Sequence, residues 1–133
     1  MLRQLPGDFD LPILITQHLP ESFMPVFARQ IEAACGRPAE IAADGMALTP
    51  GRIVIAPGHG HIVVRRTSTG LVTRISSEPA ASGCLPSVDP MLASLAEACE
   101  GRALGVILSG MGRDGALGAV SYTHLRAHET VLD

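Results

Sequence analysis

The chain has no lysine, no tryptophan, one tyrosine and three phenylalanines among its 133 residues. All ten basic residues are arginines, they are scattered, and the formal net charge is −3. This balance gives no basic patch of the kind that binds nucleic acid or polyphosphate. No apolar run approaches the roughly 20 residues of a membrane span, and the first ten residues lack the pattern of a signal peptide. We therefore expect a cytoplasmic protein without nucleic-acid partners or membrane insertion.

Metal-ligand spacings are also missing. The three cysteines, Cys35, Cys84 and Cys99, are far apart, and no CxxC pair or Cys/His ligand pattern is present. His59 and His61 are two residues apart, but two ligands without a third or fourth do not make a metal site. We interpret these two histidines as turn residues at a loop tip. The sequence therefore predicts reduced cysteines, no metal and no cofactor.

Two apolar runs each lead into a polar residue of a catalytic type. Leu11–Ile15 precedes His18, and Leu104–Leu108 precedes Asp114. Unbroken runs of Val, Ile and Leu are typical of strands buried on both faces of a parallel sheet. Ligands of such sheets bind at the carboxyl ends of the strands. We therefore expect His18 and Asp114 to lie on the same edge of one sheet, close enough for an imidazole–carboxylate contact.

Each of these residues also has a plainer interpretation. His18 has the residue type for general acid–base catalysis, but a histidine at a strand end can equally be a hydrogen-bonded structural residue. Asp114 lies in the loop Gly110–Gly115, whose backbone N–H groups could stabilise an oxyanion. There it could orient an imidazole, or it could cap the following helix. The same loop, GMGRDG, also fits the dinucleotide fingerprint G-x-G-x-x-G, so a nucleotide-binding domain is the alternative.

Strand and helix patterns alternate along the rest of the chain. Apolar spacings of three and four predict a helix over Ser22–Cys35, ended by Gly36, and a second helix with Ser87 as its N-cap. A third helix should begin at Ala116. The remaining predicted strands are Ala39–Ala43, Arg52–Ala56 and a hairpin of His61–Arg66 and Leu71–Ile75 with one wet face. This alternation indicates an α/β fold, best fitted by a three-layer sandwich with an inserted β-hairpin.

Four segments in this order carry a resemblance to a known family. They are LPILITQHLP, EIAADGMALTPGRIVIAPG followed by His61, LPSVDPMLASLA and ALGVILSGMGRDGALG. Over Leu2–Ala119 the chain resembles the catalytic domain of the chemotaxis receptor-glutamate methylesterases, the CheB family. The resemblance implies a doubly wound, mainly parallel sheet. It also implies a Ser/His/Asp triad that hydrolyses glutamate γ-methyl esters on chemoreceptors, and in some members deamidates glutamines.

Residue by residue, the resemblance assigns the catalytic His to His18 and the catalytic Asp to Asp114. The oxyanion-stabilising loop falls at Gly110, Met111 and Gly112. The partners it implies are methyl-accepting chemotaxis receptors and a fused receiver domain that gates the active site by phosphorylation. No cofactor is implied.

The chain departs from the family at the nucleophile. The family's serine lies in a GASTGG-type loop after the first strand, and none of the nine serines here has that context. We therefore expect an inactive gene fragment cut at both ends, without the serine strand and the carboxyl-terminal part. One serine must meet both His18 and Asp114, so its strand should run beside or between theirs. Its absence leaves unpaired edges, and we expect the chain alone to be aggregated or molten.

The sequence changes character at Val120. The segment 120–133, VSYTHLRAHETVLD, resembles a reading-frame translation of a transposase sequencing adapter. We therefore expect residues 1–119 to be a partial methylesterase catalytic domain and residues 120–133 to be foreign to the gene. On this interpretation His124 and His128, which are spaced like a metal pair, have no functional meaning.

Overall fold

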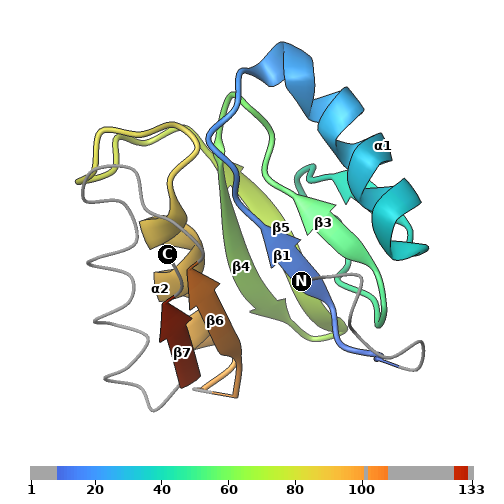
Figure 1. Cartoon of the computed structure of the whole chain (residues 1–133). Coiled ribbons are helices and arrows are strands. Elements are labelled where there is room, and N and C mark those ends of the chain that lie inside the picture. The colour runs from blue at the N-terminus through green and yellow to red at the C-terminus, as the bar shows by residue number, and fades with distance from the viewer. Residues whose placement is uncertain (1–8, 101, 108–127, 132–133) are drawn as a thin grey trace.

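The computed structural model describes residues 9–100, 102–107 and 128–131 (Figure 1). Its elements are strands, two α-helices and one short 3-10 helix, and four of the strands follow one another between the two α-helices. In chain order they are β1 (Ile13–Ile15), η2 (Glu21–Phe23), α1 (Met24–Cys35), β2 (Ala39–Ile41), β3 (Ile53–Ile55), β4 (His61–Thr67), β5 (Gly70–Ser76), α2 (Val88–Ala98), β6 (Leu104–Ile107) and β7 (His128–Val131). None of the described helices is long and apolar enough to cross a membrane.

A parallel three-stranded sheet, in the order β1-β3-β2, lies between two layers (Figure 1). The side chains of the central strand β3 alternate between the two faces of the sheet. All three are buried, because both faces are covered by other elements. Ile53 and Ile55 pack against Met24 of α1, while Val54 packs on the other side against Met91 of α2. Each face of the sheet therefore has its own apolar core. The predicted α/β sandwich of three layers is confirmed.

The inserted hairpin of β4 and β5 has both of its outer edges covered. On the β4 side, the Val64 N–H donates to Ser94 Oγ of α2 at 2.9 Å. On the β5 side, the Thr73 N–H donates to the Met46 carbonyl at 2.9 Å. Since exposed edges invite pairing with other chains, these contacts leave only the outer face of the hairpin for solvent or a partner. The predicted hairpin with one wet face is confirmed.

Strand β1 lies at an edge of the three-stranded sheet. The Ile13 N–H donates to the Arg52 carbonyl at 3.0 Å, and the Ala56 N–H donates to the Ile15 carbonyl at 2.8 Å. Because alternate residues of a parallel strand bond to opposite sides, the N–H and C=O of Leu14 point away from β3. Within the described residues no strand pairs with that side of β1, and β6 pairs only with β7. A further strand could therefore add beside β1.

The predicted capping hydrogen bond of Ser87 does not form, and two further predictions concern the carboxyl-terminal part of the chain. Ser87 precedes α2 as expected, but its side chain makes no capping hydrogen bond with the helix. Its hydroxyl lies 2.9 Å from Ser82 Oγ instead, because the preceding loop supplies the closer partner. The helix predicted from Ala116 lies outside the described residues. Strand β7 lies inside the segment 120–133, whose foreign origin stays a prediction.

Candidate active site

His18 lies three residues beyond the carboxyl end of β1, in a loop that leads to η2. The loop is tied to the core on both sides of the histidine. Before it, the Thr16 hydroxyl donates to Met91 Sδ at 3.3 Å. After it, Leu19 packs against the apolar cluster under α1. His18 itself is half-buried, so its ring lies at the surface of the sheet's carboxyl edge, where a general base could reach a substrate.

The loop after β3 supports the start of η2 by a backbone contact. A Cβ added at Gly58 would lie 2.2 Å from the Cα of Glu21 and 2.4 Å from its nitrogen. The side chains of the same segments also meet, because His59 Nδ1 lies 3.0 Å from Glu21 Oε1. His59 is exposed, as predicted for a loop tip. The loop after β3 therefore fixes the segment that follows His18, and no sequence pattern had pointed to Gly58.

His61 is a structural residue with a defined protonation state. It is 1% exposed, and the Ser87 N–H donates to its Nδ1 at 2.8 Å. Its Nε2 lies 2.8 Å from the Glu78 carbonyl, which can only accept. The ring must therefore be the neutral Nε2–H tautomer, with both nitrogens in use. Of the two predictions for His61, the strand start is confirmed, since His61 begins β4, and the loop-tip turn is wrong, because the buried ring fastens the start of α2.

Cys99 is not a candidate replacement for the missing nucleophile. All three are free thiols, and Cys99 is buried at the end of α2. Burial raises the pKa of the Cys99 thiol, and the nearby Arg66 and Arg102 only partly oppose it. A thiol with a raised pKa is a poor nucleophile. Within the described part of the chain, no group of three or more His, Cys, Asp or Glu side chains could hold a metal ion.

The second half of the expected site falls on residues that the structure does not describe. Asp114 and the loop residues Gly110, Met111 and Gly112 all follow β6, outside the described residues. Their placement relative to His18 stays a prediction. The described residues thus supply one of the expected catalytic groups, His18, and the loop contacts that hold its segment in place.

Comparisons with known proteins identify the family. The family described as CheB methylesterase matches residues 1–128. A protein-glutamate methylesterase/protein-glutamine glutaminase 2 of Koribacter versatilis is 42% identical over 122 residues, which are 90% of this chain and 34% of that protein. A protein-glutamate methylesterase/protein-glutamine glutaminase 1 of Dechloromonas aromatica is 44% identical over 118 residues, 88% of this chain and 33% of that protein. The chain thus spans about a third of these relatives' length.

A solved structure agrees with the sequence comparisons. The crystal structure of the Thermotoga maritima CheB methylesterase catalytic domain superposes with a TM-score of 0.91 at 28% sequence identity. The match covers 97% of this chain and 68% of that structure. Sequence and fold therefore agree over almost the whole chain. The chain belongs to the CheB methylesterase family.

Proposed function

We propose that the protein represented by this chain hydrolyses γ-methyl esters of glutamate side chains on chemoreceptors, with deamidation of glutamines as a second reaction. The observation that carries the proposal is His18 at the carboxyl end of β1, in a chain that belongs to the CheB methylesterase family. The names of the relatives include both reactions. The reaction class is carboxylic ester hydrolysis, and the proposed compartment is the cytoplasm.

In the proposed mechanism, His18 is the general base. It takes the proton of a serine hydroxyl as the serine oxygen attacks the ester carbonyl, and it returns that proton to the departing methoxide, which leaves as methanol. Water then repeats the step on the acyl-serine and releases the glutamate carboxylate. Asp114 orients the His18 imidazole, and the backbone N–H at Met111, within the loop from Gly110 to Gly112, stabilises the oxyanion.

The nucleophile has to come from a segment that the 133 residues do not contain, since none of their serines has the GASTGG-type context. The open side of β1, where Leu14 points its backbone groups away from β3, is the proposed place for that segment's strand. We therefore define the completed chain as residues 1–119 joined to the upstream and downstream catalytic-domain segments of the Dechloromonas aromatica relative. A receiver domain attached to the same protein is a further proposed partner of this site.

Methanol release distinguishes the proposed hydrolase from a nucleotide-binding domain. The completed chain is expected to release methanol from a peptide that carries a glutamate γ-methyl ester, in proportion to the free carboxylate formed. The same preparation should show no saturable binding of NAD or ATP by calorimetry. Saturable nucleotide binding without methanol release would reject the esterase and favour the alternative based on the Gly110–Gly115 loop.

Gly58→Ala in the completed chain is expected to lower both stability and kcat. The added Cβ would overlap the backbone of Glu21, and such overpacking costs about 1–3 kcal/mol. Because Glu21 directly follows the loop that bears His18, relieving the overlap shifts that loop. Urea unfolding and methanol release measure the two effects.

Gly36→Ala is the matched control for this change. Gly36 ends α1 with a φ of 68°, and no atom lies within 4 Å of a Cβ added there. Its replacement therefore has only a conformational cost of roughly 1–2 kcal/mol, and it should lower stability while leaving kcat unchanged. An unchanged kcat in Gly58→Ala would show that the Glu21 contact does not position His18.

A further inference from the structure

The outer face of the β4–β5 hairpin carries two arginines on neighbouring strands. In the antiparallel register Val63 lies opposite Arg74, and Arg65 lies opposite Val72. Since side chains alternate along a strand, these four residues share one face. The neighbours Ile62 and Val64 point to the other face and are buried in the core. Arg65 and Arg74 are both exposed, so the wet face of the hairpin is positively charged along its centre.

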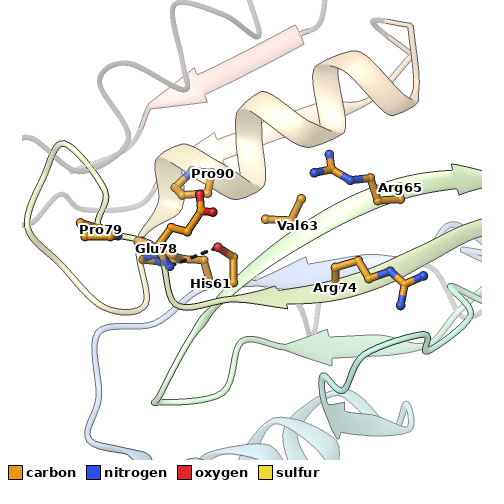
Figure 2. A pocket seen from close by; sticks show the side chains of 8 residues that line it. His61, Val63, Arg65, Arg74, Glu78, Pro79 and Pro90 are labelled. Carbon is orange, nitrogen blue, oxygen red and sulfur yellow. Dashed lines mark hydrogen bonds between the residues drawn. The ribbon is translucent and has the colours of Figure 1, made fainter.

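A cavity of about 250 Å³ lies on this face, between the hairpin and the start of α2. Figure 2 shows Glu78 beside Pro90 at one end and the two arginines at the other, with Val63 between them. The residues that line it are His61, Val63, Arg65, Arg74, Ser76, Glu78, Pro79 and Pro90. Because both nitrogens of His61 are already hydrogen-bonded, the histidine is a fixed wall of the cavity.

The two guanidinium groups have no partner within the described residues. The ion pairs recorded there lie elsewhere, between Arg52 and Glu40 and between His59 and Glu21. The adjacent Arg66, on the opposite face, donates from Nε to the Ala98 carbonyl at 2.9 Å. Arg65 and Arg74 therefore keep two like charges on one face of a two-stranded ribbon. Guanidinium donors that have no partner in the described part of the chain can bind carboxylates through charge-assisted hydrogen bonds.

The directions of the two arginine side chains indicate which kind of anion this face can bind. In Figure 2 the side-chain ends of Arg65 and Arg74 point in opposite directions, so a single small anion does not meet both as they stand. An extended acidic segment presents separate carboxylates about 7 Å apart on one side, so it offers more than one acceptor to the two guanidinium groups. The negative Glu78 carboxylate lies at the far end of the cavity, where it would repel another anion. Both hairpin edges are covered, so the contacts run through side chains and not through an added strand.

We propose that the outer face of the β4–β5 hairpin binds an acidic segment of a protein partner, through Arg65 and Arg74. This proposal does not depend on the esterase function. The probe is fluorescently labelled hexaglutamate, added at low salt to the 133-residue chain and, separately, to the completed chain, so that poor folding of the shorter chain does not decide the result. Fluorescence anisotropy should show saturable binding that weakens steeply as salt is added, because salt screens the charges.

The double variant Arg65→Gln/Arg74→Gln should weaken hexaglutamate binding at least tenfold. The matched control is Arg29→Gln/Arg102→Gln, which removes two exposed arginines from α1 and from the segment after α2 and should change the affinity less than twofold. Equal loss in both variants would show a net-charge effect and overturn the proposal. So would absence of hexaglutamate binding to the completed chain. Full displacement of hexaglutamate by inorganic phosphate at the same anion concentration would also overturn it, in favour of a small-anion site.

Discussion

His18→Gln in the completed chain is expected to lower kcat for methyl-ester hydrolysis at least a thousandfold, with little change in KM. Glutamine can fill the half-buried space beside Leu19, but it cannot take the serine proton or return it to methanol. Loss of a triad member typically costs roughly three orders of magnitude or more in kcat. Asp114→Asn should have an effect of similar size, because an amide in that place would favour the wrong imidazole tautomer. Initial rates of methanol release measure both changes.

His59→Gln is the matched control for this experiment. His59 is exposed, lies on the neighbouring loop and contacts Glu21, and glutamine can keep a hydrogen bond to that carboxylate. Its kcat should stay within about threefold of the parent, because an exposed contact of this kind contributes little energy. If His18→Gln kept the parent's rate while His59→Gln lost it, the assignment of the general base to His18 would be wrong.

The 133-residue chain as it stands is expected to release no methanol above background, whereas the completed chain turns over. The triad logic requires a positioned nucleophile, and the sequence contains no serine in the family's context. Adding the missing segments should also prevent association between copies of the chain. The edge of β1 would then no longer present the unpaired backbone groups of Leu14. An edge with unpaired backbone groups is a template for pairing with another chain, so we expect the short chain to aggregate and the completed chain to elute as a monomer.

Two controls separate these effects. Serine-to-alanine replacement in the added GASTGG-type loop should abolish methanol release and keep the monomeric elution. A scrambled upstream segment of equal length should restore neither property. Methanol release by the unextended chain would mean that another residue is the nucleophile. A monomeric short chain with a sharp cooperative melt would show that the edge of β1 is covered without the added strand.

The strands and helices could be predicted because their signals are local. The apolar run before His18 contains β1, and the spacing over Ser22–Cys35 contains the whole of α1. Gly36 ends that helix with a left-handed φ of 68°, which glycine adopts without steric strain. The expectation that His18 follows a strand came from the same local pattern, but the prediction that this strand is buried on both faces is wrong, because β1 lies at an edge of the described sheet and is only half-buried. Matches to the CheB motifs added the order of the elements and the expected position of the missing serine.

The contacts that organise the loops could not be predicted in the same way. The role of His61 depends on Glu78 and Ser87, which are 17 and 26 residues away. The close approach of Gly58 to Glu21 joins segments 37 positions apart (58 − 21). Neither contact produces a periodic pattern in the sequence, because each depends on where a loop passes over another element. Ser87 is the N-cap residue of α2 as predicted, but its hydroxyl lies 2.9 Å from Ser82 Oγ and makes no capping hydrogen bond, so a local competitor decides where a capping side chain bonds.

The hydrogen bonds between the hairpin and α2 have a mechanical consequence. Val64 bonds to Ser94 near the middle of the helix, His61 to Ser87 at its start, and Arg66 to Ala98 at its end. A helix fastened at three points along its length cannot slide or pivot against the hairpin without breaking at least one of these bonds. The hairpin and α2 are therefore expected to move as one unit, so a partner that displaces the hairpin would also displace the carboxyl end of α2, just before the strand that leads toward Asp114.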